Sequence, residues 1–188
     1  MPPVTPRRHV RVPVLRTARL VLRPFRESDR AALVKLLGQL NDRYLFDSSG
    51  RLLAPARLAA TMIRESAAAD ASESGAVSLC ILFKGGRKPV GGARVSRDAE
   101  GASEIGLWFE PDLRRRGFGK EALTALIRLC FDRWNCRRVL GRCAEENRAS
   151  RRLMEACGLR PLCTLEAEDD RGRPVRWLTY GLEAPGCP

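Results

Sequence analysis

The chain has 188 residues, of which 44% are hydrophobic, and a formal net charge of +12 at pH 7. This length can bury one hydrophobic core but not comfortably two, so we expect a single domain over residues 15–184, with a basic arm at 1–14 and a tail at 185–188. No apolar run reaches the roughly 20 residues of a membrane span, and the N-terminus lacks the apolar region of a signal peptide. We therefore expect a cytoplasmic protein.

The charged and sulfur-containing residues argue against several further classes. The 34 basic residues are spread along the chain and aromatic residues make up only 6%, so we expect no nucleic-acid surface, although a positive field would attract phosphates or an acidic protein. The seven cysteines form no C-x-x-C pair, which argues against a disulfide framework. The single histidine, His9, lies in the N-terminal arm, so neither Ser-His-Asp or Cys-His chemistry nor a metal site is expected.

The first half of the chain predicts one strand and two helices. Residues 20–22 are apolar and predict a short strand. Ser28 is placed to cap a helix whose apolar stripe is made by leucines between residues 33 and 40. The pattern breaks at 41–50, and Pro55 then suits the first turn of a second helix.

The second half predicts the greater part of a sheet. Strands are expected at 77–83, 90–96 and 104–109, and the short turns between them favour antiparallel pairing. A long amphipathic helix follows Gly117, with its apolar residues at helical spacing: Ala122, Leu123, Leu126, Ile127, Cys130, Phe131 and Trp134. The strand expected at 138–144 must run parallel to the strand at 104–109, because a helical crossover joins them.

The remaining segments complete an α/β fold. Asn147 is placed to cap another helix, and Gly158 fits its C-terminal end. Residues 163–168 and 175–182 predict a closing hairpin. The expected architecture is a mixed, mostly antiparallel central sheet with helices on both faces.

The loop before the long helix has the composition of an anion site. It reads Arg114-Arg115-Arg116-Gly117-Phe118-Gly119-Lys120, between a strand and a helix. The first turn of a helix has unpaired N–H groups and the positive end of the dipole, both of which attract anions. The glycines lack Cβ atoms, so a phosphate can approach the main chain while the basic side chains supply charge. We interpret the loop as a pyrophosphate cradle.

Three phosphate-binding patterns compete for this loop. A Walker loop requires Gly five residues before Gly119 and Ser or Thr after Lys120, whereas this chain has Arg114 and Glu121 there. The dinucleotide pattern G-x-G-x-x-A is satisfied by Gly117, Gly119 and Ala122, but a polar connector separates it from the preceding strand. The third pattern, R-x-x-G-x-G, begins at Arg114.

The third pattern resembles the acetyl-coenzyme A loop of the GCN5-related N-acetyltransferases (GNAT superfamily). Residues 147–159 resemble that superfamily's fourth helix and following turn, and residues 20–29 resemble the start of its ribosomal-protein-alanine N-acetyltransferase-like (RimJ/RimL-like) branch. The three ordered matches together cover about residues 17–183. The resemblance implies an N-acetyltransferase that moves an acetyl group directly from acetyl-CoA, its co-substrate, to a primary amine such as a protein N-terminus, with no metal.

The resemblance also implies where the coenzyme binds. In this superfamily the two parallel strands, here 104–110 and 138–144, diverge and leave a slot for pantetheine. One main-chain N–H in the slot polarises the thioester carbonyl. The residues implied for coenzyme binding are Trp108, Phe109, Glu110, Arg114, Arg115, Arg116, Gly117, Phe118, Gly119, Lys120 and Asn147.

Catalytic and acceptor residues are implied in the same way. Glu104 occupies the position of a frequent glutamate base, although a solvent-facing strand glutamate is an equal alternative, and Glu168 is a second candidate. Many members carry a tyrosine acid where this chain has Met154, so Ser150, one turn earlier, is the expected substitute. Tyr44, Phe46 and Asp47 are candidates for the acceptor pocket, with simple packing as the alternative for the two aromatic residues.

Two other classes of protein stay open from the sequence. The first is a binding module without catalysis, which would bind RNA through its basic surface or acyl-CoA as a sensor. The second is a small dinucleotide-binding protein that uses the two loop glycines. No sequence motif indicates which amine is the acceptor or what the oligomeric state is.

Overall fold

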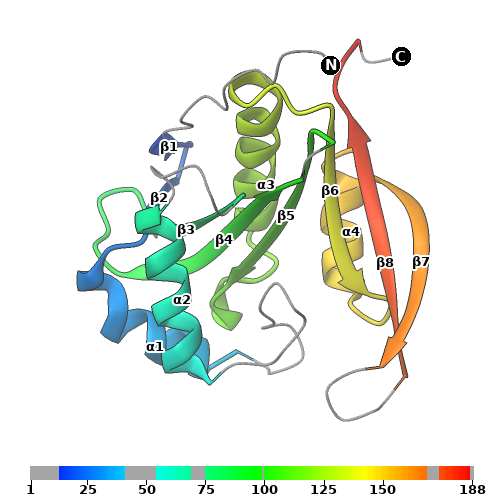
Figure 1. Cartoon of the computed structure of the whole chain (residues 1–188). Helices are drawn as coiled ribbons and strands as arrows, with labels where there is room; N and C mark the ends of the chain where they lie inside the picture. Colours follow the sequence, from blue (N-terminus) through cyan, green and yellow to red (C-terminus); the bar gives the residue numbers. More distant parts are fainter. Residues whose placement is uncertain (1–12, 41–53, 69–74, 99, 169–173, 187–188) are drawn as a thin grey trace, which may run out of the picture.

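The computed structural model describes residues 13–40, 54–68, 75–98, 100–168 and 174–186. These residues form one eight-stranded sheet in the order β1-β2-β3-β4-β5-β6-β8-β7 (Figure 1). The strands are β1 (Leu15–Arg16), β2 (Leu20–Pro24), β3 (Ala76–Phe83), β4 (Pro89–Arg97), β5 (Ala102–Phe109), β6 (Arg138–Ala144), β7 (Arg160–Glu168) and β8 (Pro174–Glu183). Only the pairing of β5 with β6 is parallel, as the helical crossover predicted.

The helices lie on both faces of the sheet, which confirms the predicted α/β architecture. The four α-helices of the described chain are α1 (Arg30–Gly38), α2 (Pro55–Ala68), α3 (Phe118–Arg128) and α4 (Arg148–Ala156). In Figure 1, α1 and α2 lie in front of the sheet, whereas α3 and α4 lie behind it. None of the described helices is long and apolar enough to cross a membrane.

Each face of the sheet has its own hydrophobic core because strand residues alternate between the faces. The larger core packs the inner side of α3, including Ala122 and Leu126, against β2 to β6. The smaller core packs α1 and α2 against the other face, where Cys80 and Leu82 of β3 are buried. Trp108 of β5 also packs against this smaller core.

One local prediction is corrected at the N-terminal end. Ser28 does not cap α1, because residues Glu27–Asp29 form a 3₁₀ turn and Asp29 is the N-cap of α1. The Asp29 carboxylate accepts the main-chain N–H of Arg26 at 2.8 Å and is held by both Nη groups of Arg23. The Asp29 side chain therefore closes the 3₁₀ turn that precedes α1, and it makes no capping hydrogen bond to the helix itself.

The long helix after Gly117 also differs from its prediction. Its α-helical part ends at Arg128, and residues Leu129–Arg133 continue as a single π-helical turn. The predicted apolar positions are buried, including Cys130 and Trp134 beyond the α-helix, except that Phe131 is only partly buried. The break lies about three turns away from the basic loop.

Candidate active site

The two parallel strands pair only at their beginnings. Residues Ala102, Ser103 and Glu104 of β5 pair with Arg138, Val139 and Leu140 of β6. Beyond these rows β5 stays paired with β4 as far as Phe109, and β6 stays paired with β8 as far as Ala144. The sheet is therefore open between β5 and β6 over their last residues, where the family resemblance implied a slot.

The main chain of β5 presents only alternate residues to this slot. The N–H of Glu110 donates to the carbonyl of Val90 at 2.9 Å, so Glu110 and, by strand alternation, Trp108 direct their main-chain groups toward β4. Leu107 and Phe109 direct theirs toward the slot. Of the residues implied for coenzyme binding on this strand, Phe109 thus directs its main-chain groups toward the slot, whereas Trp108 and Glu110 direct theirs toward β4. Leu107, which was not among the predicted residues, also faces the slot.

The basic loop bends sharply between the end of β5 and the start of α3. Arg115 has φ 61° although it is not a glycine, and Gly117, the N-cap of α3, has φ 80°. The first intrahelical bond runs from the N–H of Glu121 to the carbonyl of Gly117 at 3.2 Å. The N–H groups of residues 118–120 therefore lie in the unpaired first turn, which is the feature that binds anions.

The two loop glycines lie close to side chains from other parts of the protein. A Cβ on Gly119 would lie 3.2 Å from Cδ2 of Leu153 on α4, so this glycine allows α3 and α4 to approach each other. A Cβ on Gly117 would lie 3.4 Å from Nη2 of Arg19, and the positive φ there disfavours any side chain. Gly119 thus leaves room for Leu153, and Gly117 provides the left-handed backbone turn before α3.

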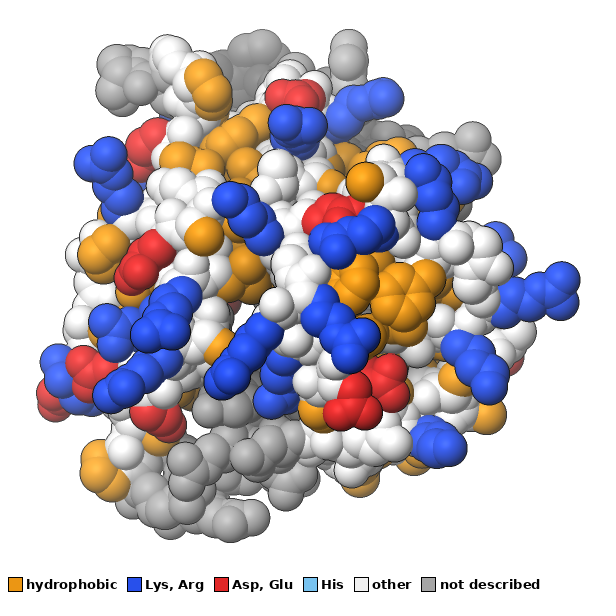
Figure 2. All heavy atoms as spheres, turned by 180° about the vertical axis from the view of Figure 1, so that it is seen from behind, with side chains coloured by type: hydrophobic (Ala, Val, Ile, Leu, Met, Phe, Trp, Pro, Cys, Tyr) orange, Lys and Arg blue, Asp and Glu red, His pale blue; other side chains and the backbone are white. Residues whose placement is uncertain are grey.

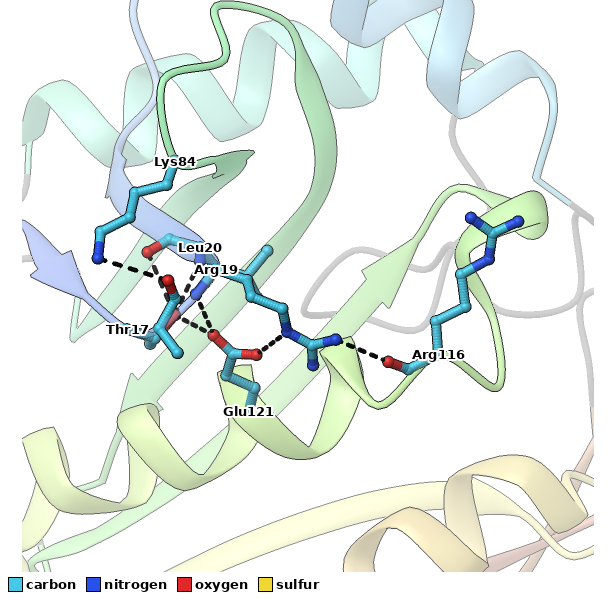
Figure 3. Close-up of polar contacts among 7 residues, drawn as sticks. Thr17, Arg19, Leu20, Lys84, Arg116 and Glu121 are labelled. Carbon is cyan, nitrogen blue, oxygen red and sulfur yellow. Dashed lines mark hydrogen bonds and ion pairs between the residues drawn. The ribbon is translucent and has the colours of Figure 1, made fainter.

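Arg19 fixes the loop from outside, and the sequence did not reveal this role (Figure 3). Its main-chain N–H and its Nε each donate to Glu121 at 2.7 Å, while its Nη1 donates to the carbonyl of Arg116 at 3.1 Å. Thr17 adds a short hydrogen bond to the same Glu121 carboxylate. Burial opposes ionisation of Glu121, but these donors outweigh it and lower the pKa of the carboxyl group.

The predicted loop residues divide into two groups. The ring of Phe118 is buried, with its centroid 5.1 Å from that of Phe83 and 6.4 Å from that of Phe109. Phe118 can therefore offer a ligand only its main chain. The second group consists of the basic loop residues, whose side chains are exposed: Arg114, Arg115, Arg116 and Lys120.

The two candidate bases lie in different places. Glu104 is in the last paired row of β5, and its Oε2 lies 3.6 Å from Nη2 of Arg142 on β6. Glu168 ends β7 and is exposed. Through Leu140 of β6, Glu104 is level with Gly181 of β8, whereas Glu168 pairs with Pro174 of β8. These two β8 residues are seven positions apart, which corresponds to about 23 Å along the strand at about 3.3 Å per residue. One amine cannot use both.

The N-terminus of α4 lies at the open end of the slot, directly after β6. Asn147 caps it as predicted, with its side-chain oxygen accepting the N–H of Ser150 at 3.1 Å. The Ser150 hydroxyl interacts with the thiol of Cys143 on β6, whose pKa is raised mainly by burial. The position of Cys143 follows from the alternation of β6, but its contact with Ser150 joins two elements and was not predicted.

Met154 occupies the position of the usual tyrosine and is part of the core. Its side chain is 4% exposed, and its Sδ would lie 2.6 Å from a Cβ on Gly141 of β6. A thioether has no proton to give. Tyr44, Phe46 and Asp47, the predicted acceptor residues, lie outside the described residues.

Basic side chains surround this end of the molecule without forming a single stripe. Figure 2 shows the face that carries α3 and α4, where Lys and Arg side chains are scattered among apolar and acidic ones. A continuous basic stripe is the usual footprint of a nucleic-acid surface. This face does not have one.

The family of the chain follows from comparison with known proteins. Residues 19–160 match the model of the acetyltransferase (GNAT) domain, and the chain therefore belongs to this family. The sequence is also 35% identical over 57 residues to YnaD, an uncharacterized N-acetyltransferase of Bacillus subtilis (strain 168). That match covers 30% of this chain and 34% of the relative.

Solved structures share the fold at low sequence identity. A GNAT-family acetyltransferase from Bacillus anthracis matches with a TM-score of 0.76 and 19% identity, covering 90% of this chain and 98% of the other. RimJ of Mycobacterium smegmatis in complex with CoA-disulfide matches with a TM-score of 0.74 and 21% identity, covering 90% of this chain and 84% of RimJ. RimL, a ribosomal L7/L12 α-N-protein acetyltransferase in complex with coenzyme A, matches with a TM-score of 0.76 and 19% identity, covering 93% of this chain and 98% of RimL. These likenesses concern the fold.

Proposed function

We propose that the protein transfers an acetyl group from acetyl-CoA to a primary amine, as a member of the RimJ/RimL-like branch. The observation that carries the proposal is the divergence of β5 and β6 after the Glu104–Leu140 row, at the end of the sheet where α3 and α4 begin. The slot offers main-chain hydrogen-bond groups to an extended ligand, and two helix N-termini with exposed arginines lie at its open end. Pantetheine with its phosphates has this distribution of polar groups and charge.

Transfer in this site needs no covalent enzyme intermediate. The amine nitrogen attacks the thioester carbonyl carbon, the carbon–sulfur bond breaks, the amine loses a proton and the thiolate gains one. The N–H of Leu107 or Phe109 polarises the carbonyl, and Glu104 accepts the amine proton directly or through water. The described residues contain no histidine to activate a serine or cysteine nucleophile.

Ser150 is the proposed proton donor to the leaving thiolate. It lies at the first turn of α4, beside the open end of the slot. A thiol has a pKa of about 8.5, so its release as thiolate at neutral pH costs only about 2 kcal/mol relative to protonated release. Water can therefore substitute, and loss of the Ser150 hydroxyl should slow the reaction by about tenfold and not abolish it.

The first experiment is thermal unfolding with and without acetyl-CoA, with NADH and a short RNA as controls. Acetyl-CoA at about 100 times Kd should stabilise the protein by roughly 2.7 kcal/mol, which is a rise of several degrees in Tm for a chain of this size. Mass spectrometry of amine acceptors incubated with acetyl-CoA then tests transfer. A shift with NADH or RNA alone, and none with acetyl-CoA, would overturn the proposal.

The alternative of an acyl-CoA sensor is favoured by one observation. Met154 provides no acid and is buried in the core, so the usual tyrosine chemistry is absent. A sensor would show the same thermal shift but no acetylated product with any amine. The dinucleotide alternative has less support, because dinucleotide folds use a mostly parallel sheet and this sheet has one parallel pair.

A further inference from the structure

The face of β5 that carries Glu104 is hollowed in the middle of the sheet. Gly106 is exposed although β5 is an inner strand, and a Cβ built on it would meet no atom within 4 Å. Alternation places Glu104 and Trp108 on the same face, one on each side of Gly106. A ligand that reaches the slot from this face would therefore lie over Gly106.

Two arginines border this hollow. Arg94 of β4 is the direct partner of Gly106, and Arg142 of β6 follows Leu140, the partner of Glu104, on the same face. Their side chains are 32% and 48% exposed, so both guanidinium groups are accessible to a ligand. The hollow thus has a carboxylate at one end and a cation on each side.

Arg94 is held in place but not saturated. Its Nε donates to the two Glu65 oxygens at 3.3 and 3.2 Å, and Glu65 is anchored in turn by the buried Ser78 hydroxyl at 2.6 Å. Within the part of the chain that the structure describes, the Nη groups of Arg94 make no hydrogen bond. A positioned guanidinium with free donors is suited to a carboxylate.

Arg142 is held only by a loose contact. The 3.6 Å that separates its Nη2 from Glu104 Oε2 is too long for a hydrogen bond, and both side chains are substantially exposed. Exposed pairs of this kind contribute little and exchange easily. A protonated amine that approaches Glu104 competes with Arg142 for the carboxylate, and the displaced guanidinium then needs another anion.

We propose that the preferred acceptor carries a carboxylate within a few bonds of its reacting amine, and that Arg94 and Arg142 select it. This inference rests on the proposed function. Strands lie about 4.8 Å apart and rise about 3.3 Å per residue, so the Cα atoms of Glu104 and Arg94 are separated by about 8 Å. A peptide N-terminus with Asp or Glu at its first or second position spans such a distance, and so does a free acidic amino acid.

The test uses matched acceptors that differ in one carboxylate. Peptides with C-terminal amides that begin Ala-Asp and Ala-Asn are compared with the single amino acids aspartic acid α-amide and asparagine α-amide, so that each pair differs only in the side-chain carboxylate. The two pairs distinguish a peptide source from an amino-acid source. Binding of each is measured by calorimetry on the protein saturated with CoA, and transfer by release of free thiol. We expect the carboxylate form to bind and react about tenfold better than the amide form.

Variants assign this preference to the arginines. Arg142→Gln and Arg94→Gln should each bring the carboxylate-to-amide ratio close to one, mainly through KM, while the Kd of acetyl-CoA stays unchanged. The control is Arg138→Gln on the same strand, whose ion pair with the exposed Glu183 lies at the other end of β6. The control should keep the full ratio.

The outcomes separate this inference from the proposed function. Transfer without a carboxylate preference, or a preference that survives both arginine variants, overturns the selection while acetyl transfer stands. Carboxylate-dependent binding without any transfer upholds the selection and overturns the catalytic proposal. A preference that is lost equally in the Arg138 control would show a general effect of charge, and would also overturn the role of the two arginines.

Discussion

Arg19 and Glu121 are joined twice, because one carboxylate oxygen accepts the main-chain N–H of Arg19 and the other accepts its Nε, each at 2.7 Å. The two residues are 102 positions apart in the chain. They connect the start of β2 to the first turn of α3, and the same arginine binds the loop carbonyl of Arg116. The geometry of the basic loop thus depends on the N-terminal part of the sheet.

Replacement of Glu121 by Gln should weaken acetyl-CoA binding by about tenfold. The substitution makes the protein more positive, so a purely electrostatic effect would tighten binding of an anionic ligand. Loss of the loop's support works in the opposite direction, because Arg19 no longer has a charged partner. The Kd from calorimetry decides between the two, with Arg16→Ala on the exposed β1 edge as a control that should change little. Tighter binding in Glu121→Gln would contradict the positioning role.

The contact between Gly119 and Leu153 predicts a pair of variants. Gly119→Ala should cost about 1 kcal/mol of unfolding free energy, since its Cβ would press on Leu153 Cδ2 at 3.2 Å. Leu153→Ala removes this obstacle, so the double variant should be less destabilised than the sum of the single ones. Urea denaturation of all three variants measures the coupling. Simple additivity would contradict a contact between these two positions that limits the side chain at residue 119.

Met154→Tyr should destabilise the protein without restoring an acid. The methionine is 4% exposed and lies against Gly141, so a larger side chain overpacks the core at a cost of about 1–3 kcal/mol. Measurements of Tm and of the transfer rate test both parts. A faster variant with an unchanged Tm would show that the position can still direct a hydroxyl into the slot.

Ionisation of Asp29 predicts a loss of stability in acid. Burial alone would raise the pKa of this carboxyl, but hydrogen bonds from Arg23 and from the main chain of Arg26 outweigh burial and lower it. The stabilisation is therefore complete above the ordinary value of about 3.8 and is lost as pH falls through the lower folded value. Asp29→Asn should lose on the order of 3 kcal/mol at pH 7, because it leaves Arg23 without its buried partner. Unfolding curves between pH 7 and pH 2 should show that the two proteins converge in acid.

Helices and strands were predicted well from the sequence where the prediction depends only on residues close together in the chain. The alternation of residues 104–109, the spacing of apolar residues after Gly117 and the cap at Asn147 all depend on near neighbours. The divergence of β5 and β6 depended on family resemblance, since no local pattern states where two strands stop pairing. The contacts of Arg19, Arg94 and Arg142 join distant segments, and an arginine-rich sequence gives no sign of which arginines will be positioned.

The seam between β5 and β6 also has a mechanical consequence. Strands β1 to β5 and strands β6 to β8 are each continuously paired, but three residue pairs are all that join the two blocks across the parallel seam. Besides these pairs, the larger core connects the two blocks, since it includes Ile105 of β5 together with Val139 of β6 and Tyr180 of β8. A molecule lying in the slot would add hydrogen bonds between the two blocks. Hydrostatic pressure, which favours the hydration of such openings, should separate the two blocks before either one unfolds, and the coenzyme should delay this separation.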